Sequence, residues 1–247
     1  MIQLLFCLLS FSAFAEFTSF REAKKAMTII HEENSVTLYC GCKYSKKVVD
    51  LKSCGYIPHK KNAKNSTEMQ WEHVVPAEAF GKSFVEWRQG SPKCLDLRKK
   101  KSYKGRKCAQ KNPEFAKMEA DPYNLYPEVG ELNQLRSNFS MAAIPVTERN
   151  KKTISFGGCL ATVHDRKFEP MDQAKGIVAR TYMYMDLTYP ERGIISGKNE
   201  KLFEIWDKKF PATEWECRRA RLIEAVHKLP NPILQMACLG MGQKKAP

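Results

Sequence analysis

The 247-residue sequence has few acidic side chains for its number of basic ones, and it has no second long apolar run after the first 15 residues. Its 27 Asp and Glu are outnumbered by 41 Lys and Arg, which gives a formal net charge of +14 at pH 7. No later segment approaches the roughly 20 apolar residues of a membrane-spanning helix. Internal repeats, Gly/Ser linkers and low-complexity tracts are also missing. These absences argue against a membrane span and a repeat protein, and they favour one globular domain.

Residues 1–15 contain no charged side chain and end in the small-x-small pattern Ala13-Phe14-Ala15. This combination is typical of a secretory signal peptide cut after Ala15, although the Lys or Arg that usually opens such a signal is missing. We therefore expect residues 1–15 to be a signal peptide. Residues 16–247 are then expected to form the mature domain of a secreted or periplasmic protein.

The cysteines lack the spacing of a zinc finger. Cys40-Gly41-Cys42 has one intervening residue where a zinc site has two to four, and no histidine pair follows at finger spacing. Cys7 lies in the expected signal peptide, and the mature chain keeps Cys40, Cys42, Cys54, Cys94, Cys108, Cys159, Cys217 and Cys238. An even number behind an export signal predicts four disulfides in an oxidising compartment, with the pairing left open.

The positive charge is concentrated in two segments. Residues 82–111 contain eleven Lys and Arg beside Glu86 and Asp96, and residues 43–64 contain seven Lys beside Asp50. Such segments usually form a solvated surface, but on an exported protein they also attract polyanions through screened electrostatics. The first partner to consider is nucleic acid, and the second is a sulfated polysaccharide or an anionic membrane surface.

Hydrophobic periodicity predicts a mainly helical α+β domain with a few short strands. The expected helices cover residues 17–33, 128–138, 174–188, 199–210 and 213–229, the last of these opening with a capping box. The expected strands cover residues 36–39 and 69–75. Residues 82–111 are expected to form an irregular basic loop, and residues 121–127 a turn between two prolines. His31, His59 and His164 are expected at the surface or in loops, and His227 on the last helix.

The stretch from Met69 to Ala77 places Glu72 directly beside His73. Successive side chains of a strand point to opposite faces, so each of these two residues can have its own role. A carboxylate suits a hard cation such as Mg²⁺, and an imidazole that titrates near neutrality can take a proton from water. An isolated Glu-His pair is more often an ordinary polar pair at a strand end, so the assignment depends on the rest of the chain.

Two other segments add candidate functional residues. On the expected helix 128–138, Asn133 offers a side-chain oxygen, which is an acceptable but weak ligand for a hard cation. A disulfide at Cys108 would hold the backbone beside Arg106, so that the guanidinium could reach one phosphate in a reproducible place. Without such a disulfide, Arg106 would be an ordinary surface arginine.

The basic segment 82–111 has a cationic run near its middle, which consists of Arg98, Lys99, Lys100 and Lys101. Trp87 and Tyr103 lie among these charges. Aromatic side chains between Lys and Arg suit stacking on unpaired bases, although a tryptophan is more often part of a core. We expect the run to bind nucleic-acid phosphates.

Six motifs occur along nearly the whole mature chain. In order they are Tyr39-Cys40-Gly41-Cys42, Cys54-Gly55-Tyr56, the stretch from Trp71 to Ala77, Gly105-Arg106-Lys107-Cys108, Tyr123-Asn124-Leu125 through Arg136-Ser137-Asn138-Phe139, and Trp215-Glu216-Cys217. Together they resemble the endonuclease I family of exported bacterial non-specific nucleases, which belongs to the ββα-metal (His-Me finger) superfamily. The pair of Glu72 and His73 before Val-Val-Pro-Ala, with a downstream Gly-Glu-x-Asn helix, is the most specific part of the resemblance.

The resemblance implies a single domain built around a ββα-metal core and a role for each matching residue. His73 is expected to be the general base, Glu72 and Asn133 the protein ligands of one Mg²⁺, and Arg106 the phosphate-binding residue. Glu119 and Asn124 are expected to support the site. The family's activity implies hydrolysis of DNA and RNA to 5′-phosphorylated fragments with little sequence preference. We expect the protein to be a monomer.

Two other functions are compatible with parts of the sequence. A non-catalytic polyanion-binding protein could share the fold and the charge, but binding alone requires none of Glu72, His73, Arg106 and Asn133. A zinc hydrolase would need metal-binding cysteines, which four disulfides would use up. The sequence favours the Mg²⁺-dependent endonuclease.

Overall fold

The computed structural model of the chain describes residues 16–60, 65–98 and 100–239, so the expected signal peptide and Lys99 lie outside the described residues. The α-helices are α1 (Phe20–Ile30), α2 (Ala77–Gly81), α3 (Val85–Arg88), α4 (Arg106–Ala109), α5 (Pro113–Glu119), α6 (Gly130–Arg136), α7 (Asp172–Thr188), α8 (Gly197–Lys209), α9 (Glu214–His227) and α10 (Pro232–Ala237). Short 3₁₀ turns are η1 (His31–Glu33), η2 (Leu51–Cys54), η3 (Pro122–Asn124) and η4 (Val146–Glu148). No described helix is both long and apolar enough to cross a membrane.

The strands are short and form four separate sheets in the described residues. They are β1 (Tyr44–Ser45), β2 (Val48–Val49), β3 (Met69–His73), β4 (Leu95–Asp96), β5 (Lys101–Ser102), β6 (Leu125–Val129), β7 (Ser140–Met141), β8 (Ile154–Phe156), β9 (Cys159–His164) and β10 (Lys167–Glu169). The largest sheet has the order β7-β10-β9-β8 and is antiparallel except for the β7–β10 pair. The expected α+β class with short strands is confirmed.

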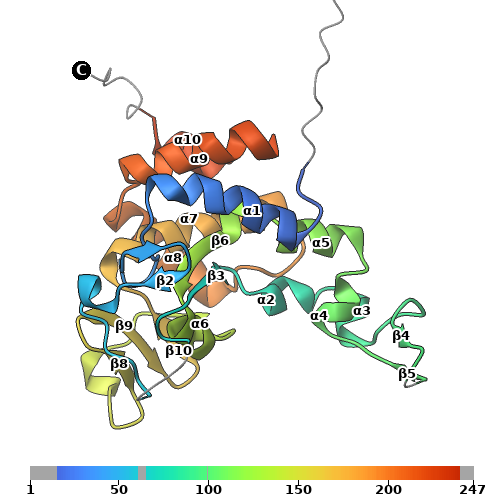
Figure 1. Cartoon of the computed structure of the whole chain (residues 1–247), viewed down its shortest axis with the longest axis horizontal. Coiled ribbons are helices and arrows are strands. Elements are labelled where there is room, and N and C mark those ends of the chain that lie inside the picture. The colour runs from blue at the N-terminus through green and yellow to red at the C-terminus, as the bar shows by residue number, and fades with distance from the viewer. Residues whose placement is uncertain (1–15, 61–64, 99, 240–247) are drawn as a thin grey trace, which may run out of the picture.

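A ββα unit lies at the centre of the domain (Figure 1) and consists of β3, β6 and α6. β3 pairs antiparallel with β6, so that Glu72 lies opposite Tyr126 and His73 opposite Leu125. α6 begins directly after β6 and contacts both strands. The expected ββα core is therefore present, with β3 ending at His73 shortly before Pro76.

The turn expected over residues 121–127 is present only in its first part, as η3, because β6 begins at Leu125. Proline usually argues against a strand because it lacks the N–H that a ladder needs. Pro127 nevertheless pairs with Trp71, and its carbonyl accepts a hydrogen bond from the Leu38 amide at 2.9 Å. The carbonyl of Pro127 thus points away from β3, and the nitrogen of a strand residue points to the same side as its carbonyl. The N–H that proline lacks is therefore not needed by the β3–β6 ladder.

Helices α1 and α9 cover the central unit on one side (Figure 1). α1 begins at Ser19, whose side chain accepts from the Glu22 amide, and it buries Ala23, Met27 and Ile30. The fully buried Arg219 of α9 donates to the carbonyls of Pro122 and Leu125 at 2.8 and 2.7 Å. These bonds hold the start of β6 against the helical layer.

Four disulfides connect these elements: Cys40–Cys159, Cys42–Cys54, Cys94–Cys108 and Cys217–Cys238. The prediction of four disulfides is confirmed, and a zinc site built from these cysteines is excluded because their sulfurs are already paired. The Cys40–Cys159 bond joins the segment before β1 to the four-stranded sheet. The Cys94–Cys108 bond lies in the basic segment.

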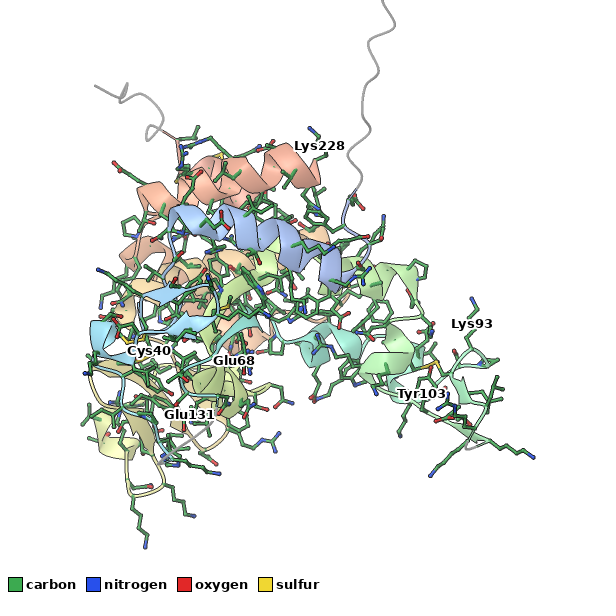
Figure 2. All side chains as sticks on the ribbon, in the orientation of Figure 1. Cys40, Glu68, Lys93, Tyr103, Glu131 and Lys228 are labelled. Atoms are coloured by element: carbon green, nitrogen blue, oxygen red, sulfur yellow. A yellow bond between two sulfur atoms is a disulfide. The ribbon has the colours of Figure 1, made fainter. Side chains whose placement is uncertain are left out.

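The basic segment 82–111 is not the irregular loop that the sequence predicts. It contains α3, the β4–β5 hairpin and α4, and it projects from the rest of the domain, as Figure 1 shows on the right. We call residues 82–111 the basic arm. Figure 2 shows Lys93 and Tyr103 on this arm, away from Glu68 and Glu131 on the body of the domain. Its strands are only two residues long, which explains why periodicity did not reveal them.

Four smaller expectations are also wrong. Residues 36–39 do not form a strand, because only Val36 makes an isolated bridge, to Lys43. The helix 213–229 is not the last one: α10 follows α9, capped by Asn231 and with Pro232 in its first turn. His164 ends a strand, and His31 is buried beside Arg219 with its ring against Trp71.

The helices expected at 17–33, 128–138, 174–188, 199–210 and 213–229 are all present, with Thr213 capping α9 as predicted.

Candidate active site

A pocket of about 350 Å³ opens where β3 meets α6, α1 and the basic arm. It brings together four residues that the sequence analysis selected from separate segments: Glu72, His73, Arg106 and Asn133. Phe20, Trp71, Glu78, Trp87, Arg136, Ser137 and Asn138 also line it. Glu119 and Asn124 lie behind this pocket rather than in its wall.

Glu72 is buried, with 3 % of its surface exposed, and two groups hold one of its oxygens. Oε1 accepts a hydrogen bond from the Tyr39 hydroxyl at 2.8 Å and lies 3.3 Å from Nη1 of Arg136. Burial raises the pKa of Glu72, whereas the Arg136 charge and the Tyr39 hydroxyl act in the opposite direction. The carboxylate is thus held at the pocket with one oxygen oriented by the protein.

Arg136 also holds the backbone at the end of β3. It donates to the carbonyl of His73 at 3.2 Å, to the carbonyl of Val74, and to the Tyr182 hydroxyl at 3.4 Å. Its side chain is almost fully buried. Arg136 therefore links α6 to β3 through both a carboxylate and two carbonyls.

A second buried carboxylate lies near Glu72. Glu128 accepts the amides of Tyr39 at 2.5 Å and of Val129 at 2.8 Å. Burial, together with the nearby charge of Glu72, raises the pKa of Glu128 to about 8 despite these two amides. Glu128 therefore positions the Tyr39 backbone, while the Tyr39 hydroxyl positions Glu72.

His73 makes its hydrogen bond through one ring nitrogen only, in the described part of the chain. Nε2 lies 2.9 Å from the carbonyl oxygen of Glu119. Because a carbonyl oxygen can only accept, Nε2 must carry the proton, and Nδ1 then presents the lone pair of the neutral ring. The ring also packs against Phe20, with centroids 4.7 Å apart.

The surroundings of His73 disfavour its charged form. Burial, together with the positive charges of Arg106, Arg136 and Lys24, lowers the pKa of His73 to about 3, although the Glu119 carbonyl opposes this shift. The ring is therefore neutral at pH 7, which is the state that a general base needs.

Arg106 lies at the start of α4, where the Cys94–Cys108 disulfide joins the two ends of the arm hairpin. Its Nε donates to Oε1 of Glu119 at 2.5 Å, and Gln110 donates to both oxygens of the same carboxylate. The Arg106 side chain remains 44 % exposed. Among the described residues, Nε is the only Arg106 nitrogen with a carboxylate partner, which leaves the end of the guanidinium available to a ligand.

Asn133 extends from α6 toward the end of β3. Its Nδ2 donates to the carbonyl of Trp71 at 3.4 Å, so its Oδ1 is free to face the pocket. Asn124 is directed elsewhere: its side chain accepts from the Val75 amide at 2.7 Å and donates to the Val75 carbonyl at 3.0 Å. Asn124 thereby fixes the chain immediately after His73 without lining the pocket.

The cationic run lies away from this pocket, in the β4–β5 hairpin of the arm. Arg98, Lys100 and Lys101 are exposed, and Lys99 lies outside the described residues. Lys101 and Arg106 both line a second pocket on the arm, of about 490 Å³. Arg106 therefore lies between the run and the pocket that holds His73.

The donors at the pocket suit a hard cation better than zinc. Glu72 and Asn133 offer a carboxylate and an amide oxygen, the ligand types that Mg²⁺ accepts together with water. The described residues contain no group of three or more His, Cys, Asp and Glu that could hold a metal ion. The site therefore fits an ion that keeps several water ligands and takes few from the protein.

Sequence reasoning missed the roles of Tyr39 and Arg136. Both residues belong to motifs that the sequence analysis singled out, so a signal was present, but neither residue type indicates by itself which carboxylate it binds. The role of the Glu119 backbone was also missed, because a carbonyl has no signature in the sequence.

Comparisons with known proteins agree on one family. The family model described as Endonuclease I matches residues 13–238. An extracellular deoxyribonuclease of Aeromonas hydrophila is 36 % identical over 227 residues, covering 89 % of each chain. A periplasmic deoxyribonuclease of the same organism is 35 % identical over 230 residues, covering 90 % of this chain and 88 % of its own. Endonuclease-1 of Buchnera aphidicola (subsp. Acyrthosiphon pisum, strain APS) is 35 % identical over 226 residues, covering 89 % of this chain and 82 % of its own.

Proposed function

Because the chain belongs to the endonuclease I family, we propose that it is a metal-dependent endonuclease that hydrolyses the phosphodiester bonds of DNA and RNA with little sequence preference. It is a secreted or periplasmic protein, as its relatives are. Residues 1–15 are proposed to be its signal peptide and residues 16–247 its nuclease domain, which acts as a monomer.

The observation that carries the proposal is the hydrogen bond between His73 and the carbonyl of Glu119. This bond places the proton on Nε2 and leaves the lone pair on Nδ1 of a buried neutral ring. The same pocket contains Glu72, Asn133 and Arg106. A non-catalytic polyanion-binding protein would need neither a neutral base nor a carboxylate held beside it.

In the proposed reaction, Nδ1 of His73 takes a proton from a water molecule that attacks the phosphorus atom in line with the leaving 3′-oxygen. The positive charge that forms on the ring faces the Glu119 carbonyl, which keeps accepting from Nε2. Asn124 holds the chain after His73, so that the base keeps its position during proton transfer. The P–O3′ bond breaks and the leaving 3′-oxygen takes a proton from solvent water, so the products are a 5′-phosphate and a 3′-hydroxyl.

Arg106 is proposed to bind the non-bridging phosphate oxygens through the exposed end of its guanidinium. Glu119 holds its Nε, which orients the planar group toward the pocket. Glu72 and Asn133 would hold one Mg²⁺, which supplies positive charge to offset the negative charge that develops on the phosphate. Exposed cations of the basic arm would bind neighbouring phosphates without reading the bases.

The test is the nicking of a supercoiled plasmid by the purified, oxidised mature protein, with Mg²⁺ and with EDTA. We expect nicking only with Mg²⁺, and we expect His73→Ala to abolish it while DNA binding persists. His59→Ala is the matched control, because His59 is exposed and does not line the pocket.

Two results would reject parts of the proposal. Nicking by His73→Ala at the wild-type rate would remove His73 as the base. An inactive wild-type protein that still binds DNA at low salt would indicate a polyanion-binding protein of the same fold.

A further inference from the structure

A groove of about 430 Å³, distinct from the pocket on the basic arm, runs beside the candidate active site along α1. Phe20 and Trp71 line both the groove and the active-site pocket, so the two hollows adjoin at these side chains. Figure 1 shows α1 above β3, and most of the residues that line the groove belong to these two elements. We call this hollow the α1 groove.

The α1 groove is strongly cationic. Arg21, Lys24 and Lys25 line it from α1, and Lys47 lines it from the β1–β2 turn on the other side. Glu68 is its one acidic lining residue in the described chain, and it accepts a hydrogen bond from Gln70 at 3.3 Å. The helix thus buries its apolar face in the domain and turns a basic face to the groove.

These four cations are not neutralised by the protein. None of Arg21, Lys24, Lys25 and Lys47 forms an ion pair with any residue that the structure describes. Lys24 instead lies over the ring of Phe20, 4.4 Å from its centroid, at the boundary between the groove and the active-site pocket. Uncompensated cations that converge on one groove favour a polyanion.

We propose that the α1 groove binds the segment of the nucleic-acid strand that flanks the scissile phosphate, with Arg21, Lys24, Lys25 and Lys47 contacting its phosphates. This inference rests on the proposed nuclease function. It makes the groove the continuation of the substrate path on the side of the active site opposite to Arg106 and the basic arm.

The size of the groove sets the length of that segment. From Phe20 to Thr28 the helix rises about 12 Å, which corresponds to roughly three nucleotides at a rise of 3.4 Å per nucleotide. The contacts are to phosphates, so the groove adds affinity without adding sequence preference. Substrates with fewer than about three flanking nucleotides would leave it partly empty.

The test compares a long and a minimal substrate with one variant and one matched control. The groove variant is Arg21→Gln/Lys25→Gln/Lys47→Gln, which spares Lys24 because its charge acts on His73. The control, Lys151→Gln/Lys201→Gln/Lys208→Gln, removes the same charge from exposed residues that line neither pocket. The substrates are a 30-nucleotide DNA and a dinucleotide with a single phosphodiester bond.

We expect the groove variant to lose about tenfold or more in kcat/KM on the 30-mer at low salt and to cleave the dinucleotide within twofold of the wild type. Binding of the 30-mer in EDTA should show a salt slope smaller by about 2 to 3, as expected for three lost phosphate contacts. The control should match the wild type in the dinucleotide assay and come close to it in the others. Equal melting temperatures show that all three proteins are folded.

Three outcomes would overturn the inference. Groove and control variants that lose equal activity and equal salt slope would show a general charge effect. A loss on the dinucleotide as large as on the 30-mer would show damage to the active site. A loss of heparin affinity with unchanged DNA binding would make the groove a polysaccharide site. Failure of the wild-type protein to cleave either substrate would instead refute the proposed function, and binding in EDTA would still test the groove.

Discussion

Nε2 of His73 lies 2.9 Å from the backbone carbonyl oxygen of Glu119, while the side chain of the same glutamate binds Nε of Arg106. One residue at the end of α5 therefore orients both the proposed base and the proposed phosphate ligand. It does so through two chemically independent groups, because the carbonyl acts on His73 and the carboxylate acts on Arg106. The two effects can be separated by substitution.

Glu119→Gln should weaken the hold on Arg106 and leave the orientation of His73 unchanged. A bond to a charged group contributes about 1.5–3 kcal/mol, so we expect kcat/KM to fall roughly 10- to 100-fold. The hydrogen bond between Nε2 of His73 and residue 119 should persist, because it is made by the backbone carbonyl and not by the side chain that is replaced. Glu114→Gln, on the exposed face of the same helix, is the control. An unchanged kcat/KM for Glu119→Gln would contradict this division of roles.

Tyr39→Phe should reduce the affinity for Mg²⁺ more than it reduces the maximal rate. The substitution removes the hydroxyl that binds Oε1 of Glu72, and loss of a group that orients a metal ligand typically costs about 10- to 100-fold in affinity. The measurement is calorimetric binding of Mg²⁺ together with a Mg²⁺ titration of plasmid nicking. Tyr182→Phe is a close control, because that hydroxyl touches Arg136 but makes no hydrogen bond to Glu72 in the described structure. Identical Mg²⁺ titrations for Tyr39→Phe and the wild type would exclude the proposed role.

Replacing Arg98, Lys99, Lys100 and Lys101 together by Gln should weaken binding to every DNA sequence alike. Arg98, Lys100 and Lys101 are exposed on the basic arm and do not line the active-site pocket, so they are expected to contact phosphates only. The slope of log K against log salt should fall in magnitude by up to about 3 to 4. Fluorescence anisotropy with several oligonucleotides over a salt series measures this slope. Weakening confined to one sequence would show that the arm reads bases.

Asp121 should make the protein less stable as the pH rises from about 4 to 6. Burial raises the pKa of its carboxyl from 3.8 to about 6, although Tyr123, Tyr184 and Tyr189 donate hydrogen bonds to it. Between these two pH values the folded protein holds a proton that the unfolded chain has released, so deprotonation on raising the pH destabilises the fold. At 1.36 kcal/mol per pKa unit, the contribution is roughly 2–3 kcal/mol.

The check is urea denaturation of the wild type and of Asp121→Asn from pH 3.5 to 7. The variant keeps the acceptor for the Tyr123 amide, and the two tyrosine hydroxyls can rotate to accept from its amide group. We expect the stability difference between the two proteins to move in favour of the variant as the pH rises. A difference that is flat over this range would show that Asp121 has an ordinary pKa in the folded protein.

The helices were largely predictable because their signals are local. Ser19 and Thr213 cap α1 and α9, and the apolar spacing of residues 23, 27 and 30 matches the buried face of α1. β6 was missed because Pro127 is a local argument against a strand, whereas its pairing with Trp71 depends on a segment far away in the sequence. The arm hairpin was missed because strands of two residues have no measurable period.

The sequence by itself determined the components of this protein: a signal-like leader, eight cysteines in the mature chain, concentrated positive charge, and the order of Glu72, His73, Arg106 and Asn133 that resembles one family. Only the tertiary structure decided which groups contact these residues, and therefore their orientation and protonation. The carbonyl of Glu119 is 46 residues from His73, and the hydroxyl of Tyr39 is 33 residues from Glu72. A proton position and a pKa depend on the nearest partner and on the loss of water, and both exist only when distant segments pack together.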